Sequence, residues 1–223
     1  MINKLIALYQ LLSNAVVLLF SNQINKKKLL KHHFKNSIIY FDVGANLGSN
    51  VKFIKKLYCE QSEIHCFEPN KKCFKILKSI KGIIANNIAI DNTNSSKNFY
   101  EHKISSWSSL KKIKGFNEKY KVNCQTLDRY ILKNKIKKID YLKIDTEGND
   151  FNVLLSARKS IKLKKIKLIE VEIIFGEENN FTNKYFDSIY GFLKKNNYLL
   201  IGINDQKIKK NRILGLNAIF CIK

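Results

Sequence analysis

The chain has 223 residues, of which 45% are hydrophobic and 26% are charged, and this balance excludes an intrinsically disordered protein. The length suits one large domain, or one domain with an appendage. The formal net charge of +23 favours anionic partners such as nucleic acid, anionic lipid or acidic substrates. However, a solvated lysine surface gives the same charge, and no compact Arg/Lys block interleaved with aromatic residues is present, so nucleic acid is disfavoured as a partner.

The cysteines and histidines indicate neither a disulfide framework nor a metal site. Five cysteines form an odd number without C-x-x-C spacing, which fits a reducing compartment such as the cytoplasm. The four histidines show no metal-ligand spacing. No metal is therefore expected from the sequence.

The N-terminal residues 1–36 are predicted to form a helical, basic appendage. Residues 5–20 are the most apolar run, but sixteen residues are short for a membrane span and polar residues interrupt them. The strongly basic stretch 26–35 follows. An apolar helix followed by a basic one is suited to peripheral contact with an anionic membrane. The alternative is a helix packed on the flank of the domain.

From residue 37 to 223 the pattern alternates between strands and helices, which indicates a single domain. Strands are predicted at 38–43, 63–68, 82–90, 140–144, 166–173, 198–203 and 216–222. Helices are predicted at 47–58, 70–79, 127–133, 149–156 and 183–196. Residues 91–126 interrupt the alternation and are interpreted as an inserted hairpin or loop region. The predicted fold is α/β, a doubly wound, mostly parallel seven-stranded sheet with an antiparallel last strand.

The turn after the first strand indicates a nucleotide-cofactor site. Asp42 lies near the carboxyl end of that strand, and Gly44 and Gly48 let the backbone turn sharply before a helix. Glu68 ends the second strand, where its two oxygens can accept both hydroxyls of a ribose. Strand, acid, two glycines, helix, strand and terminal acid in this order predict a cofactor pocket at the sheet edge.

The spacing of the glycines favours S-adenosylmethionine over a dinucleotide. A dinucleotide site needs G-x-G-x-x-G, whereas here Ala45, Asn46 and Leu47 separate the two glycines. Asp42 would also repel a pyrophosphate, but an acid is compatible with the ammonium or sulfonium of S-adenosylmethionine. A tight turn without a ligand is the alternative.

A second group of acids is expected at the same edge. Asp145 and Glu147 follow the strand 140–144 and could orient or deprotonate a hydroxyl acceptor. Capping of the next helix is the alternative for this cluster, and Asp150 is interpreted as structural. Of the two glutamates on the strand 166–173, Glu172 is expected to face the cleft, because a buried carboxylate needs a partner or a function.

The inserted region contains the only tryptophan of the chain. Trp107 lies between the hydroxyls of Ser105-Ser106 and Ser108-Ser109. An exposed aromatic ring with hydrogen-bonding neighbours is suited to a sugar face, although a tryptophan is more often packed in the core.

Several of these motifs together resemble the FkbM family of S-adenosylmethionine-dependent methyltransferases. The resemblance rests on Phe41-Asp42-Val43-Gly44-Ala45-Asn46-Leu47-Gly48, Phe67-Glu68-Pro69, Asn87-Ile88-Ala89-Ile90, Thr126-Leu127-Asp128, Leu142-Lys143-Ile144-Asp145-Thr146-Glu147-Gly148 and Ile169-Glu170-Val171-Glu172. It spans residues 38–222 and implies a Rossmann-like fold that transfers a methyl group to a hydroxyl, often of a sugar.

The resemblance also implies roles for individual residues. Asp42, Gly44, Asn46 and Gly48 would line the donor pocket, Glu68 would bind the ribose, Asn87 would lie near the adenine, and Asp145 would lie near the acceptor. Asp150 and Asp91 depart from the usual residues of the family and leave the acceptor open.

The sequence therefore predicts an O-methyltransferase acting on a small molecule or on a sugar of a cell-surface glycan or lipid-linked saccharide. The expected catalytic residues are Asp145, Glu147 and Glu172. Two alternatives stay open: an RNA methyltransferase and a non-catalytic binding protein with the same fold.

Overall fold

The computed structural model describes residues 25–112, 114–175, 184–209 and 211–223. Its strands are β1 (Ile39–Val43), β2 (Glu63–Phe67), β3 (Ile84–Asn86), β4 (Ala89–Ile90), β5 (Ser95–His102), β6 (Phe116–Gln125), β7 (Ile139–Ile144), β8 (Ile166–Ile174), β9 (Tyr198–Lys209) and β10 (Arg212–Ile222). Its helices are α2 (Lys26–His33), α3 (Ser49–Leu57), α4 (Lys71–Lys78), α5 (Leu127–Lys133), α6 (Asp150–Ser156), α7 (Arg158–Lys162) and α8 (Lys184–Lys195), with a 3-10 turn at Ser105–Trp107.

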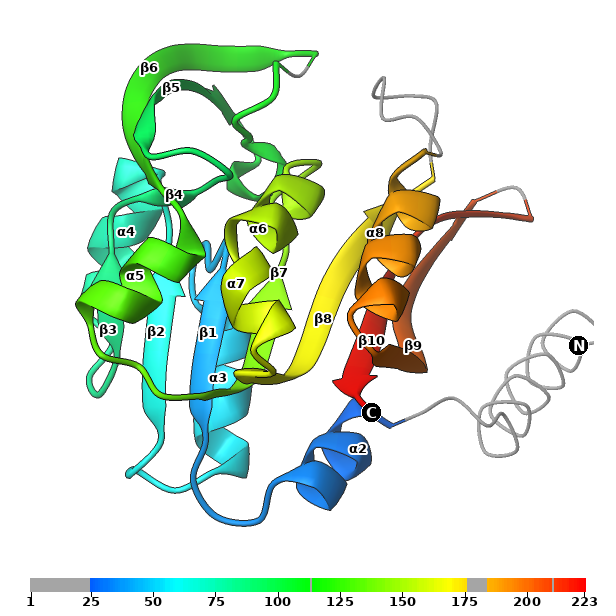
Figure 1. Ribbon diagram of the computed structural model, residues 1–223. Coiled ribbons are helices and arrows are strands. Elements are labelled where there is room, and N and C mark those ends of the chain that lie inside the picture. The colour runs from blue at the N-terminus through cyan, green and yellow to red at the C-terminus, as the bar shows by residue number, and fades with distance from the viewer. Residues whose placement is uncertain (1–24, 113, 176–183, 210) are drawn as a thin grey trace, which may run out of the picture.

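The main sheet confirms the predicted fold class. Its seven strands lie in the order β3-β2-β1-β7-β8-β10-β9 (Figure 1). The pairs from β3 to β8 are parallel, whereas β10 runs antiparallel to both β8 and β9. The carboxyl ends of β1, β2, β7 and β8 therefore point to one edge, where ligands bind in open α/β sheets.

The predicted strand 82–90 is wrong as a single element, because the chain divides it between two sheets. β3 pairs with β2 in the main sheet, and β4 pairs with β6 in a three-stranded sheet of order β4-β6-β5. Asn87 lies at the division, and its side-chain amide donates to the main-chain oxygens of Glu68 (2.8 Å) and Pro69 (3.2 Å). The predicted hairpin within 91–126 is confirmed as the antiparallel pair β5–β6.

Helices cover both faces of the main sheet (Figure 1). One face packs against α5, α6, α7 and α8, which bury residues such as Leu127, Leu154 and Leu193. The opposite face packs against α2, α3 and α4, which bury residues such as Leu30 and Val51. Apolar residues on both faces of a parallel sheet are what this double cover requires.

Helix α2 packs on the domain although it falls inside the predicted appendage. Leu30 is fully buried in the core, and Lys26 forms an ion pair of 2.7 Å with Glu170 on β8. The Glu170 carboxylate also accepts a hydrogen bond from the hydroxyl of Tyr141. The apolar run 5–20 lies outside the described residues. Within the described part of the chain, no helix combines the length and the apolar character needed to cross a membrane.

The contact between Lys26 and Glu170 gives a stability prediction. We expect Lys26→Met to lower the free energy of unfolding by about 2 kcal/mol, because it leaves the fully buried Glu170 carboxylate with Tyr141 alone. Lys27→Met, at an exposed position on the same helix, is the control and should change stability little. Adding Glu170→Gln to Lys26→Met should recover part of the loss. Equal stability of the two single variants in urea unfolding would contradict this account.

Candidate functional site

The turn after β1 lies against the end of β7. Gly44 adopts a positive φ of 83°, and a Cβ at this position would lie 1.8 Å from the main-chain oxygen of Asp145. Any larger residue would push the two strand ends apart. Glycine is therefore required where the first turn and the acid-bearing segment approach each other.

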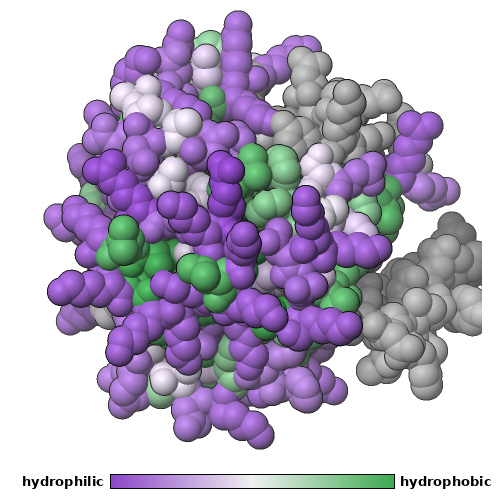
Figure 2. Space-filling view, viewed as in Figure 1, coloured by the Kyte–Doolittle hydropathy of each residue, from purple (hydrophilic) through white to green (hydrophobic). Residues whose placement is uncertain are grey.

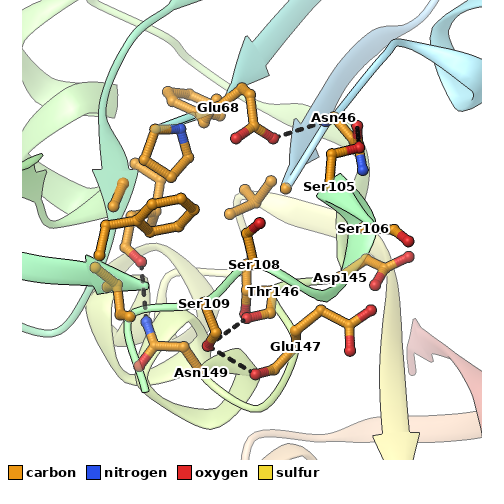
Figure 3. A pocket seen from close by; sticks show the side chains of 18 residues that line it. Asn46, Glu68, Ser105, Ser106, Ser108, Ser109, Asp145, Thr146, Glu147 and Asn149 are labelled. Atoms are coloured by element: carbon orange, nitrogen blue, oxygen red, sulfur yellow. Dashed lines mark hydrogen bonds between the residues drawn. The ribbon is translucent and has the colours of Figure 1, made fainter. Parts of the chain in front are cut away.

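A pocket, which we call the cavity, lies at this edge of the sheet (Figure 3). Polar lining residues are Asn46, Glu68, Ser105, Ser106, Ser108, Ser109, Asp145, Thr146, Glu147 and Asn149, and the other lining residues are Val43, Gly44, Phe67, Pro69, Ala89, Ile90, Phe99 and Leu110. The cavity thus combines an apolar part with several convergent polar groups.

Glu68 is held in the cavity wall by two main-chain amides. Its Oε2 accepts from the N–H of Asn46 at 2.8 Å, and its Oε1 accepts from the N–H of Asn70 at 2.7 Å. Burial raises the pKa of Glu68 to about 7, although both amide hydrogen bonds act in the opposite direction. The carboxylate is therefore fixed in position and half ionised near neutral pH.

Asp42 is not one of the described residues that line the cavity. It lies buried in β1, beside the cavity. Its side chain is fully buried, and neither carboxylate oxygen has a hydrogen-bond partner. Burial raises the pKa of Asp42 to about 6, against the opposing influence of Lys143. A buried carboxylate without a partner is costly unless a ligand compensates it.

Two other predicted donor residues support the site without lining it. Gly48 has a φ of 78°, and a Cβ there would lie 2.7 Å from Cδ1 of Ile80, so this glycine permits close packing of α3. Asn87 uses its amide to hold the main chain at Glu68 and Pro69. Gly44, Asn46 and Glu68 line the cavity as expected.

The structure brings the three predicted catalytic carboxylates together. One oxygen each of Asp145, Glu147 and Glu172 lies within 4.8 Å of the other two. Asp145 and Glu147 line the cavity and come from the segment after β7, and their carboxylates lie on the same side of it (Figure 3). Glu172 comes from β8 and is 5% exposed.

Two lysines partly neutralise this carboxylate cluster, which we define as Asp145, Glu147 and Glu172. The Nζ of Lys143 lies 2.7 Å from Asp145, and the Nζ of Lys207 lies 2.8 Å from Glu172. Burial acts to raise the pKa of Asp145, but Lys143 outweighs it and the net pKa is lowered.

The pKa values of the other two acids of the carboxylate cluster, Glu147 and Glu172, are raised. Burial and the neighbouring Asp145 raise the pKa of Glu147 to about 7. Burial and the charges of Asp145 and Glu147 raise the pKa of Glu172 to about 9. Glu147 can therefore exchange a proton near neutral pH, which is the range that acid–base chemistry requires.

The hydrogen bonds of Asp150 confirm that this residue has a structural role. Its Oδ1 accepts from the N–H of Thr146 at 2.8 Å, and its Oδ2 accepts from the N–H of Gly148 at 3.0 Å. These bonds fix the loop that carries Glu147, which itself has a positive φ of 50°. Asp150 thus positions the acids and does not line the cavity.

The serines beside Trp107 line the cavity, a role that the sequence did not assign to them. Ser105 Oγ donates to Oδ1 of Asn46 at 3.0 Å, and Ser109 Oγ donates to the main-chain oxygen of Glu147 at 2.8 Å. The inserted segment thereby connects the donor turn to the acid-bearing loop. The only signal in the sequence was the run of four hydroxyls around one tryptophan. Trp107 itself is 54% exposed and packs against the ring of His102.

The residues of this cavity fit S-adenosylmethionine. Glu68 offers a fixed carboxylate to ribose hydroxyls, and Asp42 places a second buried carboxyl group beside the cavity without lining it. Pro69, Ile90 and Phe99 supply apolar surface for a base. When bound, this cofactor supplies a methyl group activated by a sulfonium.

The comparison with known protein families shows which family the chain belongs to. The family model described as the methyltransferase FkbM domain matches residues 42–200. The chain belongs to the FkbM methyltransferase family. This membership and the fit of the cavity residues agree with S-adenosylmethionine as the cofactor. No curated protein matches the chain.

Solved structures share the fold of this FkbM family member. The methyltransferase FkbM from Methylobacillus flagellatus KT has a TM-score of 0.55 and 13% identity, over 82% of this chain and 43% of that one. This chain thus spans less than half the length of that protein. A putative rRNA-methylase from Clostridium thermocellum has a TM-score of 0.54 and 13% identity, over 88% and 93%. Magnesium protoporphyrin IX methyltransferase from Synechocystis PCC 6803, with bound SAM, has a TM-score of 0.51 and 7% identity, over 88% and 76%.

The position of Glu68 predicts a pH-dependent affinity for the donor. Its pKa of about 7 means that the carboxyl is neutral below this pH and is then a weaker acceptor for ribose hydroxyls. S-adenosylmethionine should therefore bind more tightly as the pH rises from about 6 to about 8. Glu68→Gln should weaken binding about tenfold or more at pH 8.

Calorimetry at several pH values measures this effect. Asp42 also titrates near this range, with a pKa of about 6, so the difference between wild type and Glu68→Gln isolates the part that belongs to Glu68. The same slope in both proteins would show that Glu68 does not contact the ribose.

Proposed function

We propose that the chain transfers the methyl group to a hydroxyl oxygen, and that the acceptor is a sugar of a cell-surface glycan or lipid-linked saccharide. The observation that carries this proposal is that Asp145 and Glu147 share one cavity with the donor residues Gly44 and Glu68. Carboxylates beside a methyl donor are suited to orienting a hydroxyl and taking up its proton. Alignment of the oxygen with the sulfonium methyl then contributes much of the acceleration.

The inserted segment supports a sugar as the acceptor. Trp107 offers a half-exposed ring at the same segment that carries the serine hydroxyls of the cavity. An aromatic face next to several hydrogen-bonding groups matches the alternation of apolar and polar surfaces on a sugar ring. The substrate class is inferred from this chemistry.

A second candidate function is methylation of RNA. The net charge of +23 favours it, and the Clostridium thermocellum neighbour is described as a putative rRNA-methylase. However, Figure 2 shows hydrophilic side chains spread over most of one face, as a solvated lysine surface would give. The sugar acceptor is therefore the preferred candidate.

Transfer of labelled methyl groups tests the proposal. We expect label from S-adenosylmethionine to enter a glycan or lipid-linked saccharide fraction, and Glu147→Gln to slow this at least about 100-fold. Donor binding should stay within about twofold of wild type, since the acids act on the acceptor. Glu118→Gln, at a carboxylate that is 62% exposed on β6, is the matched control and should transfer normally.

Three outcomes would overturn the sugar proposal. Label that enters RNA, together with RNA binding that falls steeply with salt, would favour the second candidate. Equal transfer by wild type and Glu147→Gln would remove the carboxylates from the chemistry. Absence of any heat on titration with S-adenosylmethionine would indicate a non-catalytic binding protein.

We also propose that the basic N-terminal part of the chain contacts an anionic membrane. Lys27, Lys28 and Lys31 are exposed on α2, and they follow the apolar run 5–20 in the sequence. Replacement of these three exposed lysines by glutamine leaves the contact of Lys26 with Glu170 in place. We expect this variant to co-sediment less than the wild type with vesicles that contain anionic phospholipid, and both proteins to leave zwitterionic vesicles unbound. Equal co-sedimentation would contradict the proposal.

A further inference from the structure

The carboxylate cluster leaves one of its three acids without an ion pair. Lys143 and Lys207 pair with Asp145 and Glu172 respectively, whereas Glu147 forms no ion pair within the described residues. Carboxyl groups whose oxygens lie within 4.8 Å of one another repel when they are ionised, and a cation bound between them relieves this repulsion.

Glu172 provides an independent sign of a missing ligand. It is 5% exposed, its Oε1 bonds to Lys207, and its Oε2 is buried without any hydrogen-bond partner. A buried carboxylate oxygen in a folded protein normally has a donor or a metal as its partner. The free oxygen belongs to a side chain whose carboxylate lies within 4.8 Å of the other two acids.

We propose that Asp145, Glu147 and Glu172 bind one divalent cation of the Mg²⁺ or Mn²⁺ type at the acceptor side of the cavity. Three carboxylate oxygens without nitrogen or sulfur ligands select a hard cation. Metal–oxygen bonds of about 2.1–2.4 Å can join oxygens that lie within 4.8 Å of one another, after small side-chain rotations. These acids are expected from the sequence at one edge of the sheet, but not as metal ligands, because Glu172 lies 25 residues after Glu147 and no histidine takes part.

This inference rests on the proposed function and specifies how the acids act in it. The acceptor hydroxyl would bind the cation, which would lower the pKa of the hydroxyl, and water would take up the proton in place of a carboxylate. The oxygen then forms a bond to the methyl carbon as the carbon–sulfur bond breaks. The products are the methyl ether, S-adenosylhomocysteine and one proton.

Titration of the full-length protein with Mn²⁺, followed by the electron paramagnetic resonance signal of the free ion, tests the site without any acceptor. In the presence of S-adenosylhomocysteine we expect one bound Mn²⁺ per chain, displaced by Mg²⁺. Glu147→Gln should weaken Mn²⁺ binding at least tenfold, while Glu118→Gln should leave it unchanged. Lys207→Met should strengthen it several-fold, because this lysine, which is 63% exposed, competes for Glu172.

Glu147→Gln should weaken Mn²⁺ binding and Lys207→Met should strengthen it. These opposite effects distinguish a metal site from a cluster whose role is only structural. No Mn²⁺ binding at millimolar concentration, or binding that neither Glu147→Gln nor Lys207→Met alters, would overturn the inference. If Glu147→Gln does not fold, as circular dichroism would show, the surface variant Lys207→Met decides alone. Calorimetry with S-adenosylmethionine is run beside the metal titration. If the donor binds but Mn²⁺ does not, the cation site is ruled out and the proposed function stands. If the donor does not bind, both the cation site and the proposed function are ruled out.

Discussion

Four parallel strands end at one edge of the sheet, and each carries a carboxylate at or next to its end: Asp42 on β1, Glu68 after β2, Asp145 after β7 and Glu172 on β8. Burial of so many like charges in one place is the constraint on which the rest of the site depends. Main-chain amides hold Glu68 by hydrogen bonds. Lys143 and Lys207 form ion pairs with Asp145 and Glu172 on the other side of the edge. Asp42 alone has no hydrogen-bond partner for either oxygen.

The arrangement of these partners divides the edge into two halves. Amide donors fix the Glu68 carboxyl group in place, where its oxygens can accept hydrogen bonds from the polar groups of a nucleoside. On the other half, lysines hold Asp145 ionised while Glu147 keeps a pKa near neutrality. This division suits the proposed methyl transfer, in which one half binds the donor and the other orients the acceptor.

Much of the fold and of this edge could be predicted from the sequence, because the relevant signals are local. Alternation of β-rich and helical segments requires parallel crossovers, and parallel strands bring their carboxyl ends together. Asp42, Glu68, Asp145 and Glu147 could therefore be assigned to one edge without knowledge of distances. Glu172 could be added because a buried strand with two glutamates needs a reason for each of them.

The features that the sequence missed depend on contacts between distant segments. Ser105 and Ser109 reach Asn46 and Glu147 across 59 and 38 residues, so no local pattern reveals the inserted segment as a cavity wall. Lys26 reaches Glu170 across 144 residues, and this contact decides for the alternative in which a helix of the N-terminal part packs on the flank of the domain. The amide of Asn87 donates to the main chain at Glu68 and Pro69, which no local pattern shows, and its place near the adenine stays a prediction.

The account rests on the claim that this edge binds the methyl donor with its ribose at Glu68 and its sulfur toward the carboxylate cluster. A crystal structure of the chain with S-adenosylhomocysteine measures this directly. The account predicts electron density in the cavity, with the two ribose hydroxyls on the Glu68 carboxylate and the sulfur on the side of Asp145 and Glu147. Density at another surface, or a ribose that does not touch Glu68, would contradict it.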